Sequence, residues 1–292
     1  MSGTATGFER RPWGLVVVTG ADATPFLQSI VSQDLEGVAV GATVPSLLLA
    51  PQGKLDAMFR ATRLDEGDPG GDEWWLDTEP GVADRLVAGL VRFRIRVDVA
   101  IEDRTESTAL ASLVGRDDVP AAPGLHRIPT VWGAQSGIDV LGPAPAVRAW
   151  LAESGVPVGT EAALEALRIE AGIPAQGVDV DETTIPQEAF LEREAVSFTK
   201  GCFIGQELVC RIDSRGHVNR FLRRLDVPGD GVPERGAAVV HGGKTVGSVT
   251  SAARVPGERR VVALAMVRRE VEPPETVTVT VAGRAVPAAL VG

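Results

Sequence analysis

Short apolar runs broken by glycine and proline predict alternating strands and helices in the first part of the chain. A β-branched run at 15–18 predicts a strand, and the apolar residues after it have helical spacing, so either Asp22 or Thr24 is expected to cap a helix. The next two apolar runs, 46–49 and 55–61, flank a proline–glycine turn and predict a hairpin.

The stretch that follows predicts a loop, a strand, a helix and a second strand. The range 65–72 is polar and rich in glycine, which is typical of a loop, and a short strand is expected at 73–76. Apolar residues at helical spacing predict a helix over 82–91. Apolar and polar residues then alternate along 93–101, which is the clearest strand pattern in the sequence.

The middle of the chain contains two expected joints and one well-marked helix. Proline, glycine and aspartate gather at 115–124 and 142–145, which predicts loops or joints between lobes. Thr160 is expected to cap a helix that runs to Ala171, because Gly172 and a nearby proline end it.

Beyond residue 216 the pattern changes to short β-rich runs, which predict a small barrel or sandwich. These runs lie at 237–240, 245–249, 261–267 and 276–281. The glycine pair at 242–243 is expected to form a hairpin turn, and it does not complete a phosphate loop because Ala238 stands where such a loop needs glycine. We therefore divide the chain near residue 216.

Composition narrows the class of function. The chain has 292 residues and a net charge of −10, and an acidic field repels phosphate backbones, so no nucleic-acid partner is expected. Two cysteines and three scattered histidines predict no resident metal site and no disulfide framework. No apolar run reaches the roughly 20 residues of a membrane helix, and the first residues have no signal-peptide core, so we expect a cytoplasmic protein without a membrane partner.

Three arginines at alternate positions suggest a local anion site. On the expected strand 93–101, Arg94 and Arg96 share one face with the preceding Arg92. Such a stripe can hold an anionic tail such as a polyglutamate, because arginine grips carboxylates bidentately. The alternative is a solvated sheet face paired with Asp98.

Cys202 is the candidate nucleophile of the chain. It follows Lys200 by two residues and precedes a helix expected to start near Gly205, and both a cation and a helix N-terminus stabilise a thiolate. The alternative is a small buried side chain with an inert thiol.

The residues around Cys202 carry a resemblance to a known family. K-G-C-F-I-G-Q-E at 200–207, followed by Arg211, resembles the K-G-C-[FY]-x-G-Q-E-x-x-x-R motif of YgfZ-type folate-binding proteins, implicated in iron–sulfur cluster assembly and repair. These proteins belong to the superfamily of the aminomethyltransferase (T-protein) of the glycine cleavage system. Similarity extends to G-A-D-A at 20–23, the hairpin turn, R-I-E-A-G-I-P at 168–174 and G-S-V-T-S at 247–251.

The resemblance implies an α+β, three-lobed, aminomethyltransferase-like folate-binding fold. Residues 1–216 would form a folate-binding region of two interleaved α+β lobes, and residues 217–292 a C-terminal β-barrel domain. It also implies a protein that binds tetrahydrofolate, or a one-carbon derivative of it, and supports iron–sulfur cluster assembly or repair in client enzymes. Its partners would be reduced folate and iron–sulfur client or assembly proteins.

The same resemblance assigns roles to individual residues. A pterin ring presents two parallel N–H donors that one carboxylate can accept, and Glu188 stands where the superfamily places a pterin-binding glutamate. Glu170 and Asp179 are weaker candidates, and an exposed loop acid is the alternative for Glu188. Arg94 or Arg96 would meet the glutamate tail, and Cys202, helped by Lys200, would be the functional thiol.

Two other functions remain open at this point. Asp56, after the hairpin turn, occupies the place of the acid that assists one-carbon transfer in the glycine-cleavage enzyme, so the chain could be an aminomethyltransferase or demethylase. Ala57 departs from that pattern, because those enzymes tend to carry a second acid there, and an ordinary strand-surface aspartate is the alternative for Asp56. The third reading is a scaffold that has kept the fold and lost the ligand.

Overall fold

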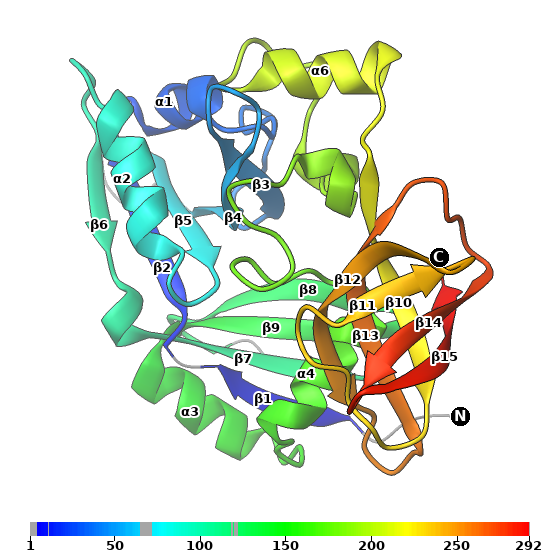
Figure 1. The fold of residues 1–292 in the computed structure, drawn as a ribbon. Helices are drawn as coiled ribbons and strands as arrows, with labels where there is room; N and C mark the ends of the chain where they lie inside the picture. The colour runs from blue at the N-terminus through cyan, green and yellow to red at the C-terminus, as the bar shows by residue number, and fades with distance from the viewer. Residues whose placement is uncertain (1–4, 11, 65–71, 118, 120–121, 292) are drawn as a thin grey trace.

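Two open sheets and a closed barrel are arranged around a central connecting segment (Figure 1). The computed structural model describes residues 5–10, 12–64, 72–117, 119 and 122–291. The expected loop at 65–72 lies outside the described residues except for Asp72, which begins a strand. The combination of α+β lobes with a C-terminal barrel agrees with the predicted fold class.

The first lobe is a five-stranded sheet with two helices on one face. In spatial order its strands are β3 (Thr43–Leu49), β4 (Leu55–Leu64), β5 (Asp72–Thr78), β2 (Gly14–Gly20) and β6 (Ala100–Asp103). Its helices are α1 (Ala23–Ile30) and α2 (Ala83–Phe93), and their buried side chains pack on the alternating apolar face of β4. The predicted strand at 15–18, the hairpin and the helix at 82–91 are all confirmed.

The second lobe is a four-stranded sheet covered by α3 (Ala144–Glu153). Its strands in spatial order are β1 (Thr6–Arg10), β7 (Thr108–Val114), β9 (Gln135–Pro143) and β8 (His126–Trp132). A 3-10 turn, η1 (Thr105–Ser107), leads into β7. Two separate stretches of the chain form this lobe, because β1 precedes all strands of the first lobe and pairs with β7, which follows them.

A closed six-stranded barrel forms the C-terminal part. Around the barrel the strands are β10 (Arg220–Pro228), β13 (Arg260–Arg268), β12 (Lys244–Arg254), β11 (Ala238–His241), β14 (Glu275–Val281) and β15 (Arg284–Val291). The four strands predicted from the β-rich runs are confirmed, and Gly242 and Gly243 form the expected turn. The patterns missed β10 and β15, which close the barrel; β10 carries four charged side chains among its nine residues.

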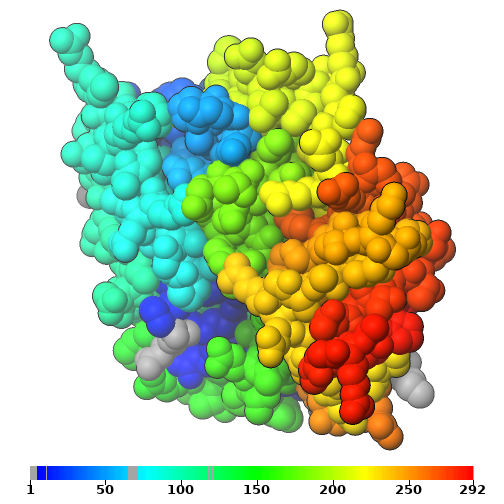
Figure 2. Space-filling model, viewed as in Figure 1, coloured from blue at the N-terminus to red at the C-terminus, as the bar shows by residue number. Residues whose placement is uncertain are grey.

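Between the lobes and the barrel lie the remaining helices. These are α4 (Glu161–Glu170), the 3-10 turn η2 (Pro186–Ala189), α5 (Glu192–Ala195) and α6 (Gln206–Arg215). The Thr160 hydroxyl accepts a hydrogen bond from the Ala163 amide, and Gly172 follows the helix with a positive φ of 74°, so both predicted ends of α4 are confirmed. In Figure 2 the green segment around residues 170–190 is packed between the cyan first lobe and the orange barrel.

The predicted strand over 93–101 is wrong. Leu86, Leu90 and Phe93 also have helical spacing, and the structure follows that period, so α2 continues to Phe93. The chain then turns through Arg96, which has a φ of 56°, and pairs with β2 only from Ala100. Arg94 and Arg96 are therefore exposed residues of a connection and share no strand face, which corrects the predicted arginine stripe.

Two smaller predictions are also corrected. Neither Asp22 nor Thr24 caps α1 with its side chain. The Asp22 carboxylate instead accepts a hydrogen bond from the Asp98 amide, and Thr24 accepts one from the Trp74 indole. The expected joint at 142–145 is the junction at which β9 passes directly into α3.

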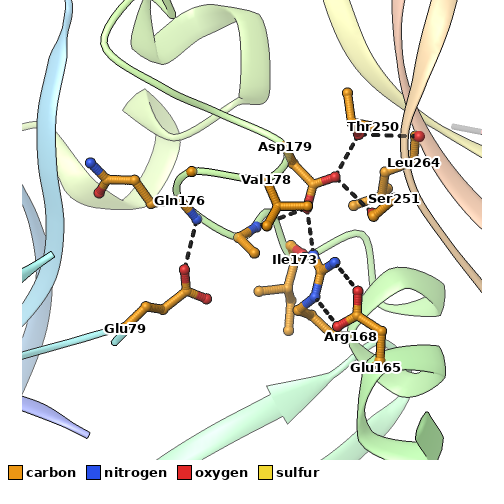
Figure 3. Close-up of polar contacts among 12 residues, drawn as sticks. Glu79, Glu165, Arg168, Ile173, Gln176, Val178, Asp179, Thr250, Ser251 and Leu264 are labelled. Atoms are coloured by element: carbon orange, nitrogen blue, oxygen red, sulfur yellow. Dashed lines mark hydrogen bonds and ion pairs between the residues drawn. The ribbon is translucent and has the colours of Figure 1, made fainter. Parts of the chain in front are cut away.

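A buried ion pair joins α4 to the barrel (Figure 3). Arg168 and Asp179 are 6% and 4% exposed, and Arg168 Nη1 lies 2.7 Å from Asp179 Oδ2. The second carboxylate oxygen, Oδ1, accepts hydrogen bonds from the Thr250 and Ser251 hydroxyls of β12. One carboxylate therefore fixes the helix, the segment after it and the barrel wall relative to one another.

The other groups around this pair are also satisfied. Arg168 donates to both oxygens of Glu165 and to the Ile173 carbonyl, and Asp179 accepts from the Ala175 amide. These partners and the nearby acids keep the pKa of Arg168 above its ordinary value despite its burial.

We expect Asp179→Ala to lower the free energy of unfolding by about 3–5 kcal/mol. The substitution removes the buried carboxylate that pairs with Arg168, so that the more exposed Glu165 is the remaining acid of the pair. Urea denaturation measures this loss. The matched control is Glu165→Ala, which removes the more exposed partner and should cost about 1 kcal/mol or less. Equal losses in the two variants would contradict the role assigned to Asp179.

Candidate functional site

Two adjacent cavities lie where the lobes meet the central segment. The α4 cavity has a volume of about 750 Å³ and is bordered by β1, β8 and α4. The β3–β4 cavity has a volume of about 500 Å³ and is bordered by the first hairpin and the segments 172–174 and 189–195. Arg10, Trp13 and Glu79 line both cavities, and each volume is in the usual range of small-molecule sites.

Glu79 is the acid that lines both cavities. Its Oε2 accepts a hydrogen bond of 2.7 Å from the Gln176 amide, and Oε1 accepts none from the described residues (Figure 3). Burial raises the pKa of Glu79, which the Gln176 amide and the charges of Arg10 and Arg168 partly oppose. The result is a desolvated carboxyl group with one oxygen available beside a cavity.

An aromatic face lies next to this acid. The Trp13 side chain is buried, and the Arg10 guanidinium lies 4.0 Å from its ring centroid. The Trp13 indole nitrogen donates to Asp77 Oδ2 at 3.0 Å, which fixes the orientation of the ring.

Asp77 belongs to a charged cluster at the base of the β3–β4 cavity. Arg60 lies 2.6 Å from both Asp77 and Asp139, and these two acids raise the pKa of the guanidinium. The cluster connects β4, β5 and β9, and therefore holds the two sheets together beneath Trp13.

The sequence did not single out Glu79, Trp13 or Arg10. Arg10 ends β1 and Trp13 immediately precedes β2, whereas Glu79 follows β5 more than sixty residues later. The one local signal was an acid between a strand and the Pro80–Gly81 turn, which does not reveal a cavity.

The predicted pterin acids occupy other positions. Glu188 is buried and pairs with Arg220 through both oxygens, at 2.9 and 3.2 Å, and its Oε2 also accepts from the Ile185 amide. Glu170 pairs with Arg260 of the barrel at 2.6 Å, and Asp179 serves the ion pair described above. None of these three acids is among the residues that line the two cavities.

Three further predicted site residues also lie outside the cavities. Asp56 faces α2 and pairs with Arg85 at 3.2 Å. Its neighbour Ala57 is fully buried in the core of the first lobe, where an acid would have no solvent. Arg94 and Arg96 are exposed on the connection after α2 and line neither cavity.

Lys200 holds the end of α1. Its ammonium group donates three hydrogen bonds of 2.7–2.9 Å to the carbonyls of Gln28, Val31 and Gln33, which are the last or following carbonyls of the helix. Burial lowers the pKa of Lys200 to about 8, and all three donors are used at neutral pH. Lys200 is thus a positioning residue for α1, which differs from the predicted role of activating Cys202.

Other residues of the K-G-C-F-I-G-Q-E segment also have structural contacts. Phe203 is buried, and its amide donates to Gln206 Oε1. Gly205 has a φ of 78°, and a Cβ there would lie 2.5 Å from the Ala50 carbonyl of the hairpin. The segment therefore seats the start of α6 against the hairpin turn and α1 (Figure 1).

The rest of the motif faces outward. Cys202, Glu207 and Arg211 are exposed, and their side chains make no hydrogen bond or ion pair with the described residues. Cys210, the other free cysteine, is half-buried, and burial raises the pKa of its thiol. Of the two thiols, Cys202 is the accessible one.

Neither a metal centre nor a membrane helix is found in the parts of the chain that the structure describes. No group of three or more His, Cys, Asp or Glu side chains there could hold a metal ion. No helix there combines the length and the apolar character that crossing a bilayer requires.

Comparison with known proteins agrees with this architecture. Residues 220–292 match the glycine cleavage T-protein C-terminal barrel domain. An aminomethyltransferase of Rubrobacter xylanophilus is 28% identical over 97% of this chain and 81% of its own length. The crystal structure of the glycine cleavage system aminomethyltransferase T from Bartonella henselae has a TM-score of 0.84 and 22% identity, over 99% of this chain and 86% of that one.

The chain is similar to proteins of the aminomethyltransferase (T-protein) superfamily, and its C-terminal part matches the barrel domain of the glycine cleavage T-protein. A further relative, the mitochondrial iron–sulfur cluster assembly factor IBA57 homolog of Mycosarcoma maydis, is 28% identical over 75% of this chain and 57% of its own length. Together with the motif at 200–207, it confirms the predicted resemblance to YgfZ-type proteins of that superfamily. The aminomethyltransferase-like fold class is likewise confirmed.

We expect Lys200→Met to lower the free energy of unfolding by about 1–3 kcal/mol, because three carbonyls at the end of α1 lose their donor. Cys202→Ser should change it by about 0.5 kcal/mol or less, since the thiol is exposed. Chemical denaturation of the two variants measures both values. An unchanged free energy of unfolding in Lys200→Met would contradict the positioning role of Lys200.

Proposed function

We propose that this YgfZ-type protein binds a reduced folate in the two central cavities and supports iron–sulfur cluster assembly or repair in client enzymes. The observation that carries the folate part is the open carboxylate oxygen of Glu79 beside the fixed ring of Trp13. The aminomethyltransferases among its relatives belong to a folate-dependent class, which supports the same ligand.

The chemistry of the cavity suits a pterin. A pterin edge offers an N–H and an amine that a carboxylate accepts together, while the flat ring prefers an aromatic or apolar wall. Glu79 supplies the acceptor and Trp13 supplies the aromatic wall, and Met58 and Phe190 add apolar lining to the β3–β4 cavity. We therefore propose Glu79 as the pterin anchor, while Glu188 remains a prediction that would require Arg220 to leave its carboxylate.

The iron–sulfur part rests on the outward-facing residues of the motif. Lys200, Phe203 and Gly205 are explained by packing, whereas Cys202 and its exposed neighbours Glu207 and Arg211 are not. An accessible thiolate is a ligand for iron–sulfur clusters and a nucleophile toward partner groups. We propose Cys202 as the thiol that serves the client or assembly proteins.

Removal of the Glu79 charge should weaken folate binding. We expect Glu79→Gln to raise the Kd for tetrahydrofolate about tenfold or more, because the negative charge that strengthens the hydrogen bond to the available oxygen is lost. Calorimetric titration or the folate-induced shift in melting temperature measures the effect. Glu188→Gln is the matched control; if it abolishes binding while Glu79→Gln does not, Glu188 is the anchor. No stabilisation of the wild type at saturating folate would favour the scaffold alternative.

The same experiment has a pH dependence. The pKa of Glu79 is raised, so its carboxyl group retains a proton to a higher pH than an exposed glutamate and accepts fewer hydrogen bonds while protonated. Affinity for folate should therefore increase as pH rises through this pKa, and Glu79→Gln should remove that increase. An identical pH profile in both proteins would exclude Glu79 from the site.

The thiol role is tested in a strain that lacks the gene. We expect wild type and Cys210→Ser to restore iron–sulfur enzyme activity, and Cys202→Ser to restore it to less than about one tenth, because an alcohol does not replace a thiolate ligand. Western blotting confirms equal protein levels. Full restoration by Cys202→Ser would refute the proposal, and glycine-cleavage activity lost in Asp56→Ala would favour the aminomethyltransferase alternative.

A further inference from the structure

A projecting turn of the first lobe carries three arginines and two exposed apolar side chains. It comprises residues 91–96, which are the last turn of α2 and the start of the connection to β6, and we call it the arginine tip. In Figure 2 it projects from the upper left of the molecule. Ile95 is 72% exposed, the highest value among the exposed large apolar side chains of the described residues, and Val91 is 45% exposed. Single exposed apolar residues are ordinary, whereas two of them within five residues on one projection form a small contact surface.

The arginine tip has a fixed shape. Phe93 and Val97, on either side of Ile95, pack against the core of the first lobe, whereas Ile95 faces solvent. At the base of the tip the Asp98 amide donates to Asp22 Oδ2 at 2.8 Å, and the Asp22 amide donates to the Asp98 carbonyl at 3.2 Å. A preformed surface loses little conformational entropy when a partner binds to it.

The positive charge of the tip is unpaired. Within the described part of the chain, no hydrogen bond or ion pair involves the side chain of Arg92, Arg94 or Arg96, and Arg92 lies only over the ring of its neighbour Phe93, at 5.6 Å. Asp98, the nearest acid along the chain, pairs with none of them. Three neighbouring guanidinium groups without partners, in a chain with a net charge of −10, form a local site for carboxylates.

Helix α1 connects the tip to the residues that we propose to serve client proteins. Asp22, just before the helix, holds the base of the tip, while Lys200 and Ile204 donate to carbonyls near the other end of the helix. A helix of eight residues is about 12 Å long. The end of α2, α1 and α6 lie along one edge of the molecule (Figure 1), so a single bound protein can contact both the tip and Cys202.

We propose that the arginine tip binds an acidic segment of the client or assembly protein that meets Cys202. The identity of this partner rests on the proposed function, whereas the surface is argued from its own residues. Carboxylates of the segment would pair with the arginines, which donate paired hydrogen bonds to them, and an apolar side chain would cover Ile95 and Val91. An anionic membrane is less suitable, because so extended a surface would also meet the acidic remainder of the protein, whereas a segment meets the tip alone.

The binding test uses an acidic peptide as the probe. A short fluorescein-labelled peptide of glutamate and leucine, and the same peptide with lysine in place of glutamate, are titrated with the protein and followed by fluorescence anisotropy. We expect only the glutamate peptide to bind, and the double variant Arg94→Glu/Arg96→Glu to raise its Kd about tenfold or more. The matched control is Arg268→Glu/Arg284→Glu, which makes the same charge change at exposed barrel residues and should alter the Kd less than about twofold, because distant charges are screened.

Three results of this titration would overturn the proposal. They are absence of peptide binding, an equal loss of binding in the two double variants, and binding of the lysine peptide as tight as that of the glutamate peptide. Phosphatidylserine vesicles test the membrane alternative. If they bind and the peptide does not, and if only Arg94→Glu/Arg96→Glu releases them, the tip contacts lipid and the proposal is wrong.

The strain that lacks the gene separates failure of the docking surface from failure of the proposed function. We expect Arg94→Glu/Arg96→Glu to restore less than about one third of the iron–sulfur enzyme activity, because charge reversal repels an acidic partner. Its melting temperature, and the reactivity of Cys202 with a maleimide in a Cys210→Ser background, should match the unsubstituted protein and show that the variant is folded. Full restoration by this variant while Cys202→Ser stays inactive overturns the docking surface and leaves the thiol role intact. Full restoration by Cys202→Ser defeats the proposed function, and the assignment of the partner fails with it.

Discussion

The contact between Asp179 and Arg168 sets the relation between the barrel and the rest of the protein. A buried carboxylate is costly unless its charge and its lone pairs are matched, and here the guanidinium, one amide and two hydroxyls provide the match. Those partners come from α4, from the segment after it and from β12, so the carboxylate is satisfied only when all three are correctly placed. The loop from 173 to 180, which carries the amide that binds Glu79, is positioned by the same contact.

This arrangement links the stability of the fold to the geometry of the cavity. Gln176 lies on the loop anchored by Asp179, and its backbone amide orients Glu79 while its side chain bonds to the backbone of β4. The wall of the cavity is thus held from the barrel side and from the first lobe at the same time. Trp13, fixed through Asp77 and the Arg60 cluster, is held independently from the sheet side.

The sequence predicted those elements whose local residue pattern is compatible with a single secondary structure. The cap at Thr160, the hairpin at 46–61 and four barrel strands are local in this sense. Phe93 fits two patterns, because it begins the alternation along 93–101 and also continues the helical spacing of Leu86 and Leu90. In the structure it lies on the same helix face as these two leucines. The barrel strand at 220–228 was missed because its charges pair with neighbours that the sequence does not show, such as Asp226 with Arg260.

Site residues were harder to predict than elements, for a related reason. The sequence predicted functional roles for Lys200, Glu188 and Glu170, and the structure shows that each has a partner distant in sequence. Glu79 is notable for an available carboxylate oxygen, a property that depends on what surrounds the side chain in space.

The order in which the strands pair has a consequence for synthesis on the ribosome. Thr6 in β1 pairs with Val114 in β7, so β1 leaves the exit tunnel without this partner and waits until more than a hundred further residues have been made. The five-stranded sheet between them can close first, because β2 to β6 are all complete by residue 103. The nascent chain therefore carries β1 as an unpaired strand while the neighbouring sheet forms, and an unpaired strand can pair with other chains.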